Sequence, residues 1–231
     1  TNDGTGNLNP TAAAGIVGGA QEFNGTNTGI KVPAHPSFGW YQNQLFSIEF
    51  WVKRDDAVPV AGDPEVVIGR YESATTLRWW VGITNTQVVR FSLTATNNTG
   101  FNVVGSTDVV DGEWHHVVAM REAGEIRIYV DGVLDGTTAG ATFGAGFEST
   151  TADLTIGLYN AGFYLDGLVD EVALYDRALP LDEIEDHYDA GLLGRGIDYV
   201  APDPDDDTPS KKSGGGGGGG GCFISAISTP R

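Results

Sequence analysis

Apolar and polar side chains alternate with a period of two along much of the chain. This period is typical of β-strands with one buried face, because successive side chains of a strand point to opposite sides of the sheet. The clearest run covers residues 45–53. One face of this run carries Phe46, Ile48, Phe50 and Val52, and the other carries Ser47, Glu49, Trp51 and Lys53. We therefore predict a strand here, half of whose side chains enter a core.

Similar runs recur between clusters of glycine, asparagine, aspartate and threonine. They cover residues 30–32, 66–70, 77–83, 88–94, 113–121, 125–130, 154–157 and 168–175. Asp131-Gly132 favours a tight hairpin into Val133-Leu134. Many short strands separated by turn residues are typical of antiparallel sandwiches and barrels. The predicted fold class is therefore all-β.

One short helix is predicted near the C-terminal end of the strands, from Leu181 to Ala190. Leu181, Ile184 and Tyr188 recur at helical spacing and form an apolar stripe, and Gly191 is expected to end the helix. The acidic side chains between them are expected to face solvent. This helix should pack on the sheets.

The composition divides the chain into three parts. Residues 1–195 are predicted to form a single β-sandwich domain, and residues 196–213 a linker rich in proline and aspartate. Residues 214–231 begin with eight glycines and end in an apolar segment that starts at Cys222. The last part is expected to be an extended tail.

The charge restricts the classes of partner. The net charge is −18, which repels nucleic acid and favours calcium, a salty medium or a basic partner surface. No run approaches the roughly 20 apolar residues of a membrane helix. The chain starts at Thr1 and its only methionine is Met120, so we expect export followed by processing at this end, while the stop at Arg231 suggests truncation or proteolytic maturation. Cys222 is either an inert thiol or the point of an intermolecular disulfide, a lipid or another covalent anchor.

Four segments in order resemble the laminin-G-like (concanavalin-A-like) jelly-roll family. They are Gly18-Gly19-Ala20-Gln21-Glu22-Phe23-Asn24-Gly25, Phe46-Ser47-Ile48-Glu49-Phe50-Trp51-Val52-Lys53, the pair Asp111-Gly112-Glu113-Trp114-His115-His116-Val117 with Ile128-Tyr129-Val130-Asp131-Gly132-Val133, and the run from Ile156 to Leu179. The resemblance covers roughly residues 10–192 and implies a jelly-roll sandwich. The tail resembles a bacterial C-terminal segment in which polyglycine precedes a Cys-Phe-Ile box.

The resemblance implies a non-enzymatic recognition, adhesion or accessory module of an extracellular protein, often with one calcium ion. Strand alternation places Asp170 on the face of Leu168, Val172 and Leu174, where a carboxylate needs a partner. By the resemblance, Asp170 with Asn24 and Asn27 of the 24–27 turn are the calcium ligands we predict. The alternative is an Asp170 carboxylate capped by backbone N–H groups and a hydroxyl.

The motifs of enzymes are absent from the sequence. There is no Glu-x-Asp-x-x-Glu run for glycoside hydrolysis, no His-Glu-x-x-His and no Gly-x-Ser-x-Gly. His115 and His116 are adjacent strand residues that face opposite ways, so a packed or hydrogen-bonded pair is expected rather than a metal site. The chain is therefore predicted not to be an enzyme.

Two pairs of aromatic residues, Trp40-Tyr41 and Trp79-Trp80, should each place one ring in the core and one outside. Trp40 and Trp80 are the candidate glycan contacts, although plain packing explains both pairs as well.

The tail suggests a device for assembly or anchoring. Lys211 and Lys212 lie directly before the glycines Gly214 to Gly221, while the body of the chain is acidic. The tail is predicted to add as a strand to a neighbouring subunit, held by Phe223, Ile224 and Ile227. The leading hypothesis is thus a bacterial extracellular structural protein that self-assembles as a fibre or surface layer, or is anchored at the cell surface, through its tail. The alternative is a calcium-dependent carbohydrate-binding or adhesion module that binds cell-surface glycans.

Overall fold

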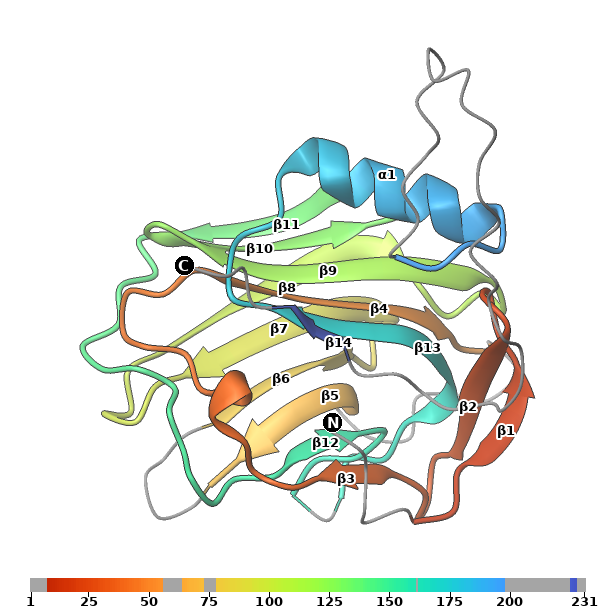
Figure 1. The fold of residues 1–231 in the computed structure, drawn as a ribbon, viewed down its shortest axis with the longest axis horizontal. Coiled ribbons are helices and arrows are strands. Elements are labelled where there is room, and N and C mark those ends of the chain that lie inside the picture. Colours follow the sequence, from red (N-terminus) through yellow and green to blue (C-terminus); the bar gives the residue numbers. More distant parts are fainter. Residues whose placement is uncertain (1–7, 56–63, 73–77, 161, 198–224, 228–231) are drawn as a thin grey trace, which may run out of the picture.

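The computed structural model describes residues 8–55, 64–72, 78–160 and 162–197, and the backbone of Ser225–Ile227. These residues form two sheets that pack face to face, with one α-helix on the outside (Figure 1). The predicted all-β sandwich with one short helix is confirmed. Among the described residues, no helix is both long and apolar enough to cross a membrane.

The larger sheet has eight strands in the order β1-β2-β13-β4-β9-β10-β11, with β14 beside β13. Its strands are β1 (Thr11–Ala14), β2 (Gly19–Asn24), β4 (Phe46–Lys53), β9 (Trp114–Glu122), β10 (Glu125–Val130), β11 (Val133–Ala139), β13 (Asp166–Tyr175) and β14 (Ser225–Ile227). The smaller sheet has six strands in the order β3-β12-β5-β6-β7-β8. Its strands are β3 (Ile30–Val32), β5 (Glu65–Tyr71), β6 (Arg78–Ile83), β7 (Val88–Thr94), β8 (Gly100–Asp108) and β12 (Leu154–Ile156). A short 3-10 helix, Pro36–Phe38, precedes β4.

The main core lies between the two sheets and follows the predicted alternation. Phe46 and Phe50 of β4 are at most 1% exposed and join Val81 and Phe91 of the smaller sheet in one apolar cluster. The Asp131-Gly132 hairpin is also confirmed, because both residues have positive φ angles, 52° and 79°. The edge strands β1 and β8 carry little apolar patterning and were not predicted, since an edge strand buries few side chains.

The opposite face of the larger sheet is covered by α1 (Leu181–Leu192), as Figure 1 shows. Ile184 of the helix packs into a second apolar cluster with Val118, Met120 and Tyr175. Ser47 and Glu49 of β4 are fully buried on this face. The second face of β4, for which the sequence predicted no cover, is therefore buried under the helix.

The predicted end of the helix at Gly191 is wrong. The helix continues through Gly191 to Leu192, and the chain turns at Gly194, whose φ is +68°. Gly191 instead permits close packing, because a Cβ atom there would lie 2.3 Å from Cζ2 of Trp51.

The predicted face of Asp170 is also wrong. A bulge follows Asp170 in β13, where Glu171 adopts a φ of +47° and one extra residue enters the strand. Asp170 therefore lies opposite Trp51 on the helix-covered face, whereas Val172 and Leu174 enter the main core. Simple alternation breaks at the bulge.

Strand β14 pairs in parallel with Ala173–Tyr175 of β13 in the same chain. Strand β2 covers the earlier part of that edge of β13, up to Val169. The tail segment thus adds a strand to its own sheet in this structure. The predicted tail residues Lys211, Lys212, Gly214, Gly221, Cys222, Phe223 and Ile224, with Thr1 and Arg231, lie outside the described residues, as does the side chain of Ile227.

Candidate functional site

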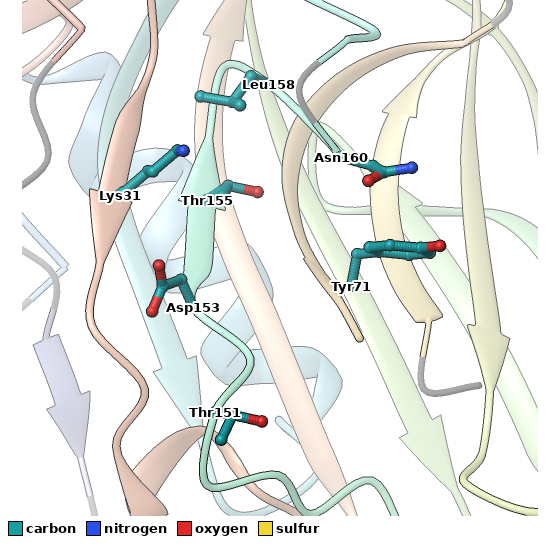
Figure 2. A pocket seen from close by; sticks show the side chains of 7 residues that line it. All are labelled: Lys31, Tyr71, Thr151, Asp153, Thr155, Leu158 and Asn160. Atoms are coloured by element: carbon teal, nitrogen blue, oxygen red, sulfur yellow. The ribbon is translucent and has the colours of Figure 1, made fainter. Parts of the chain in front are cut away.

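A hollow of about 280 Å³ opens on the outer face of the smaller sheet. Its lining consists of Lys31, Tyr71, Thr151, Asp153, Thr155, Leu158 and Asn160. In Figure 2, Lys31, Asp153 and Thr155 lie on one side of this hollow, and Tyr71 and Asn160 lie on the other. An aromatic ring therefore faces an ammonium, a carboxylate and a hydroxyl group across one pocket.

Cross-strand register brings these residues together from distant parts of the sequence. Lys31 of β3 pairs with Thr155 of β12, which pairs with Gly69 of β5. Gly69 in turn pairs with Trp80 of β6. Because paired residues share a face, the four positions form one row across the outer surface of the sheet. Leu154 and Ile156, the neighbours of Thr155, point the other way into the core.

A glycine allows a second aromatic ring to lie on this row. A Cβ atom at Gly69 would lie 2.9 Å from Cδ2 of Tyr159, so only glycine lets the Tyr159 ring approach the sheet. Tyr159 meets Tyr71 edge to face, with ring centroids 5.7 Å apart. Burial raises the pKa of the Tyr159 hydroxyl, and the nearby charge of Arg78 opposes this rise. The buried Tyr159 ring and the half-buried Tyr71 and Trp80 rings thus form an aromatic cluster beside the hollow.

Arg70 fixes the loop that supplies two residues of the lining. Its guanidinium group is buried and donates to the carbonyl oxygens of Ala152 (2.8 Å) and Ser149 (3.2 Å) from Nη2, and to Phe38 O (2.6 Å) from Nη1. Burial lowers the pKa of Arg70 to about 10, so it stays charged at neutral pH. The hydrogen bonds of Arg70 therefore fix the backbone next to Thr151 and Asp153.

A second hollow, of about 250 Å³, lies near the end of β9 and includes Arg121 and Phe143. In this second hollow the guanidinium group of Arg121 already makes hydrogen bonds within the protein. Arg121 donates to the carbonyl oxygens of Gln42 (2.5 Å) and Gln44 (3.1 Å) and stacks over Phe143 at 4.9 Å. In the first hollow, Thr151, Asp153 and Thr155 also make hydrogen bonds within the protein. Its Lys31, Tyr71 and Asn160 side chains make none within the described residues, so this hollow is the better candidate site.

The comparisons with known proteins agree with this architecture. The profile of the Laminin_G_3 family, described as the concanavalin A-like lectin/glucanases superfamily, matches residues 24–185. The chain belongs to this superfamily. No curated protein matches the sequence.

Several solved structures share the concanavalin A-like fold at low identity. The binding domain of Paraclostridial mosquitocidal protein 1 aligns with a TM-score of 0.63 and 15% identity, covering 81% of this chain and 46% of that one. The receptor binding domain of botulinum neurotoxin D aligns at 0.61 with 13% identity, covering 80% and 47%. This chain spans about half the length of those two toxin domains. Domain 4 of AbnA, a GH43 extracellular arabinanase from Geobacillus stearothermophilus in complex with arabinotriose, aligns at 0.59 with 21% identity, covering 77% and 80%.

The two predicted glycan contacts have different positions in this concanavalin A-like fold. Trp80 is half-buried on the outer face of the smaller sheet, beside the candidate site. Trp40 is 1% exposed and stacks on Phe46 at 3.7 Å in the main core, so its selection is wrong. Its neighbour Tyr41 is the exposed member of that pair, at 69%. The pairs do divide between core and surface as predicted.

The predicted calcium ligands come together only in part. Asn24 and Asn27 are bonded to each other, Nδ2 of Asn24 donating to Oδ1 of Asn27 at 2.9 Å. Asn24 pairs with Asp166, four residues before Asp170 along β13. The Asp170 carboxylate accepts hydrogen bonds from the N–H groups of Val17 (3.0 Å) and Glu171 (2.9 Å), which matches the backbone part of the alternative interpretation but not its hydroxyl. In the described part of the chain, no group of three or more Asp, Glu, His or Cys side chains is arranged to hold a metal ion. Calcium binding stays a prediction, and these three residues do not form one site here.

The two adjacent histidines face opposite ways and are hydrogen-bonded, as expected. His115 contacts Asp131 (2.8 Å) and Asp111 (3.1 Å). His116 contacts Oε1 of Glu49 at 2.7 Å on the helix-covered face. Glu49 is therefore part of a buried cluster rather than a surface group.

This buried cluster attaches α1 to the larger sheet. His187 of α1 lies 2.9 Å from Oε1 of Glu49, and Tyr175 donates to Oε2 at 2.6 Å. Burial opposes ionisation, yet the hydrogen bonds of His116 and His187 outweigh it and hold the pKa of Glu49 at about 2. Burial likewise opposes protonation of His187, yet Glu49 raises its pKa. The cluster is closed off from solvent, so its role is structural.

Sequence reasoning singled out Trp80 beside the candidate site but none of the residues that line the hollow. Tyr71 falls on the outer face by alternation, so it could have been found. Tyr159 and Asn160 follow β12 in a loop, where no period applies, and their approach to Tyr71 depends on the folded chain.

Proposed function

We propose that this chain is a non-catalytic carbohydrate-binding module that holds a glycan in the hollow on the outer face of the smaller sheet. The observation that carries the proposal is the juxtaposition of the Tyr71 ring with Lys31, Asp153 and Asn160 around one pocket. A sugar ring has an apolar face that packs on an aromatic ring, and hydroxyl groups that need donors and acceptors at its edge. Binding sites generally combine apolar surface with a few placed polar groups in this way.

The comparisons support a binding module over an enzyme. The similar structures described above are binding domains of toxins and domain 4 of an arabinanase, which is in complex with arabinotriose in its own structure. We place this module outside the cell, at a bacterial cell surface, as the family resemblance and the tail suggest. Calcium remains a candidate cofactor of glycan binding.

Removing the aromatic ring should weaken glycan binding. For the polysaccharide that binds best in a panel screen, we expect Tyr71→Ala to lower the affinity about tenfold, because an aromatic anchor in a pocket commonly carries 1 kcal/mol or more of the binding energy. Isothermal titration calorimetry on the full chain checks this. Tyr41→Ala removes an equally large exposed ring outside the hollow and should change the affinity less than twofold. Equal losses in the two variants would place the glycan elsewhere.

Assembly through the tail is a second candidate function. The pairing of β14 with the edge of β13 favours it, because a strand that adds to its own sheet can also add to the same edge of another copy. The similar structures give this role less support than glycan binding, since they are described as binding domains.

Deleting the tail distinguishes the two roles. If the tail links subunits, the intact chain should form species larger than a monomer in sedimentation velocity and fibres in negative-stain microscopy, and a chain that ends at Val200 should do neither. The shortened chain should bind glycan as the intact chain does. Monomers in both samples would rule out assembly and leave glycan binding unaffected.

A further inference from the structure

The outer face of the smaller sheet carries positive charge that the rest of this acidic chain does not balance. The chain has 31 acidic and 13 basic residues, so most cations on its surface should find a carboxylate. Arg54, Arg127 and Arg177 do so. Within the described residues, no carboxylate pairs with Arg78 or Arg90, and each guanidinium group lies over an aromatic ring.

These two arginines flank Trp80. Trp80 of β6 pairs with Ser92 of β7. Arg78 lies two residues before Trp80, and Arg90 lies two residues before Ser92 on the antiparallel neighbour. Because residues two apart in a strand share a face, both arginines lie on the outer face, one on each side of the indole ring.

Aromatic rings hold the two guanidinium groups in place. Cζ of Arg78 lies 5.8 Å from the centroid of Tyr71, which lines the hollow, and Cζ of Arg90 lies 5.9 Å from the centroid of Trp80. A guanidinium group that lies over an aromatic ring keeps its edge N–H groups available to donate two hydrogen bonds to a planar anion.

The carboxylates near the hollow indicate how a charged ligand would be oriented there. Asp153 lies across the hollow from Tyr71 (Figure 2), and Glu72 is hydrogen-bonded to Thr151. An anionic group is therefore disfavoured on the Asp153 side and favoured beyond Tyr71, where Arg78 and Arg90 lie. Hydroxyl groups of the same ligand suit the mixed side with Lys31 and Thr155.

We propose that the ligand of this face is an anionic glycan, whose carboxylate or sulfate groups bind Arg78 and Arg90 while a sugar ring packs in the hollow on Tyr71. This inference rests on the proposed carbohydrate-binding function and specifies its ligand class. The shared chemistry is an anionic oxygen group carried on a sugar. The geometry favours charges spaced on either side of Trp80.

Three polymers with one backbone test the charge requirement and its source. Dextran, carboxymethyl-dextran and dextran sulfate are titrated into the full chain beside a panel of neutral polysaccharides. At least one charged polymer should bind at least tenfold more tightly than dextran, and the preference between the two identifies carboxylate or sulfate. Raising the salt concentration should weaken this binding, because the arginines are near the surface.

Variants then locate the binding. Arg78→Gln and Arg90→Gln should each lower affinity for the charged polymer about tenfold, as expected for a charge-assisted hydrogen bond. Lys53→Gln removes the same charge from the larger sheet and should change affinity less than twofold.

Equal losses in all three variants would overturn the proposal, because they would indicate a general charge effect. A second outcome is that the wild type binds neutral polysaccharides as tightly as charged ones and that Arg78→Gln binds them equally well. This result would overturn the anionic inference but leave the proposed function standing. No binding to any polymer would refute both.

Discussion

Replacing Glu49 with alanine should lower the free energy of unfolding by about 3–5 kcal/mol. The carboxylate is fully buried and accepts hydrogen bonds from His116, His187 and Tyr175. Its loss leaves those three polar groups buried without their partner and removes the hydrogen bond between α1 and the larger sheet. Urea denaturation followed by tryptophan fluorescence measures the change. Glu185→Ala, on the exposed side of the same helix, should change the stability by less than about 0.5 kcal/mol.

The pH dependence of stability should change in the same variant. The pKa of Glu49 falls from 4.5 to about 2 in the folded state, so its contribution is present above pH 4.5 and is lost as the pH falls towards 2. The pKa of His187 is raised above 6.5, so its contribution is present below pH 6.5 and is lost as the pH rises through the folded value. The difference in stability between the wild type and Glu49→Ala should therefore be largest between about pH 4.5 and 6.5. A difference that does not vary with pH would show that the carboxylate is not coupled to the histidine.

Replacing Gly191 with alanine should destabilise the fold by about 1–3 kcal/mol. Helix propensity alone predicts the opposite, since alanine is favoured over glycine inside a helix by about 1 kcal/mol. The new Cβ would lie 2.3 Å from Cζ2 and 2.7 Å from Cε2 of Trp51, a ring with no exposed surface. The helix must therefore move away from the sheet, and thermal and urea unfolding would report the loss.

Gly162→Ala is the matched control for this substitution. A Cβ atom at Gly162 meets no atom within 4 Å, and its φ is ordinary, so its stability should stay within about 0.5 kcal/mol of the wild type. A stabilised Gly191→Ala variant would mean that α1 does not pack on Trp51 at this distance.

The fold was largely predictable because alternation is a local property. Phe46, Ile48, Phe50 and Val52 enter the core as their spacing predicts, and the Asp131-Gly132 turn lies where the dipeptide placed it. The errors have structural causes that the period of the sequence does not record. Asp170 changes face because of a bulge, and Gly191 lies inside the helix because Trp51 packs against it. Neither a bulge nor a contact between distant residues alters the period of the sequence.

The candidate site was less predictable because its residues are distant in the chain. Lys31, Tyr71 and Thr155 lie on three strands, and only the pairing of β3, β12 and β5 makes them neighbours. Trp40 and Trp80 were equivalent candidates in the sequence, but one is buried against Phe46 and the other lies on the outer face.

The sequence by itself determined the sandwich, its short helix and the membership of the concanavalin A-like superfamily, since the period of apolar residues and the family motifs lie along the chain. The tertiary structure alone decided which faces are covered and which remain open. Alternation separates two faces of a strand, but whether a helix or solvent covers the second face depends on packing. That difference makes Glu49 a buried attachment point for α1 and leaves Tyr71, Trp80, Arg78 and Arg90 on an open surface.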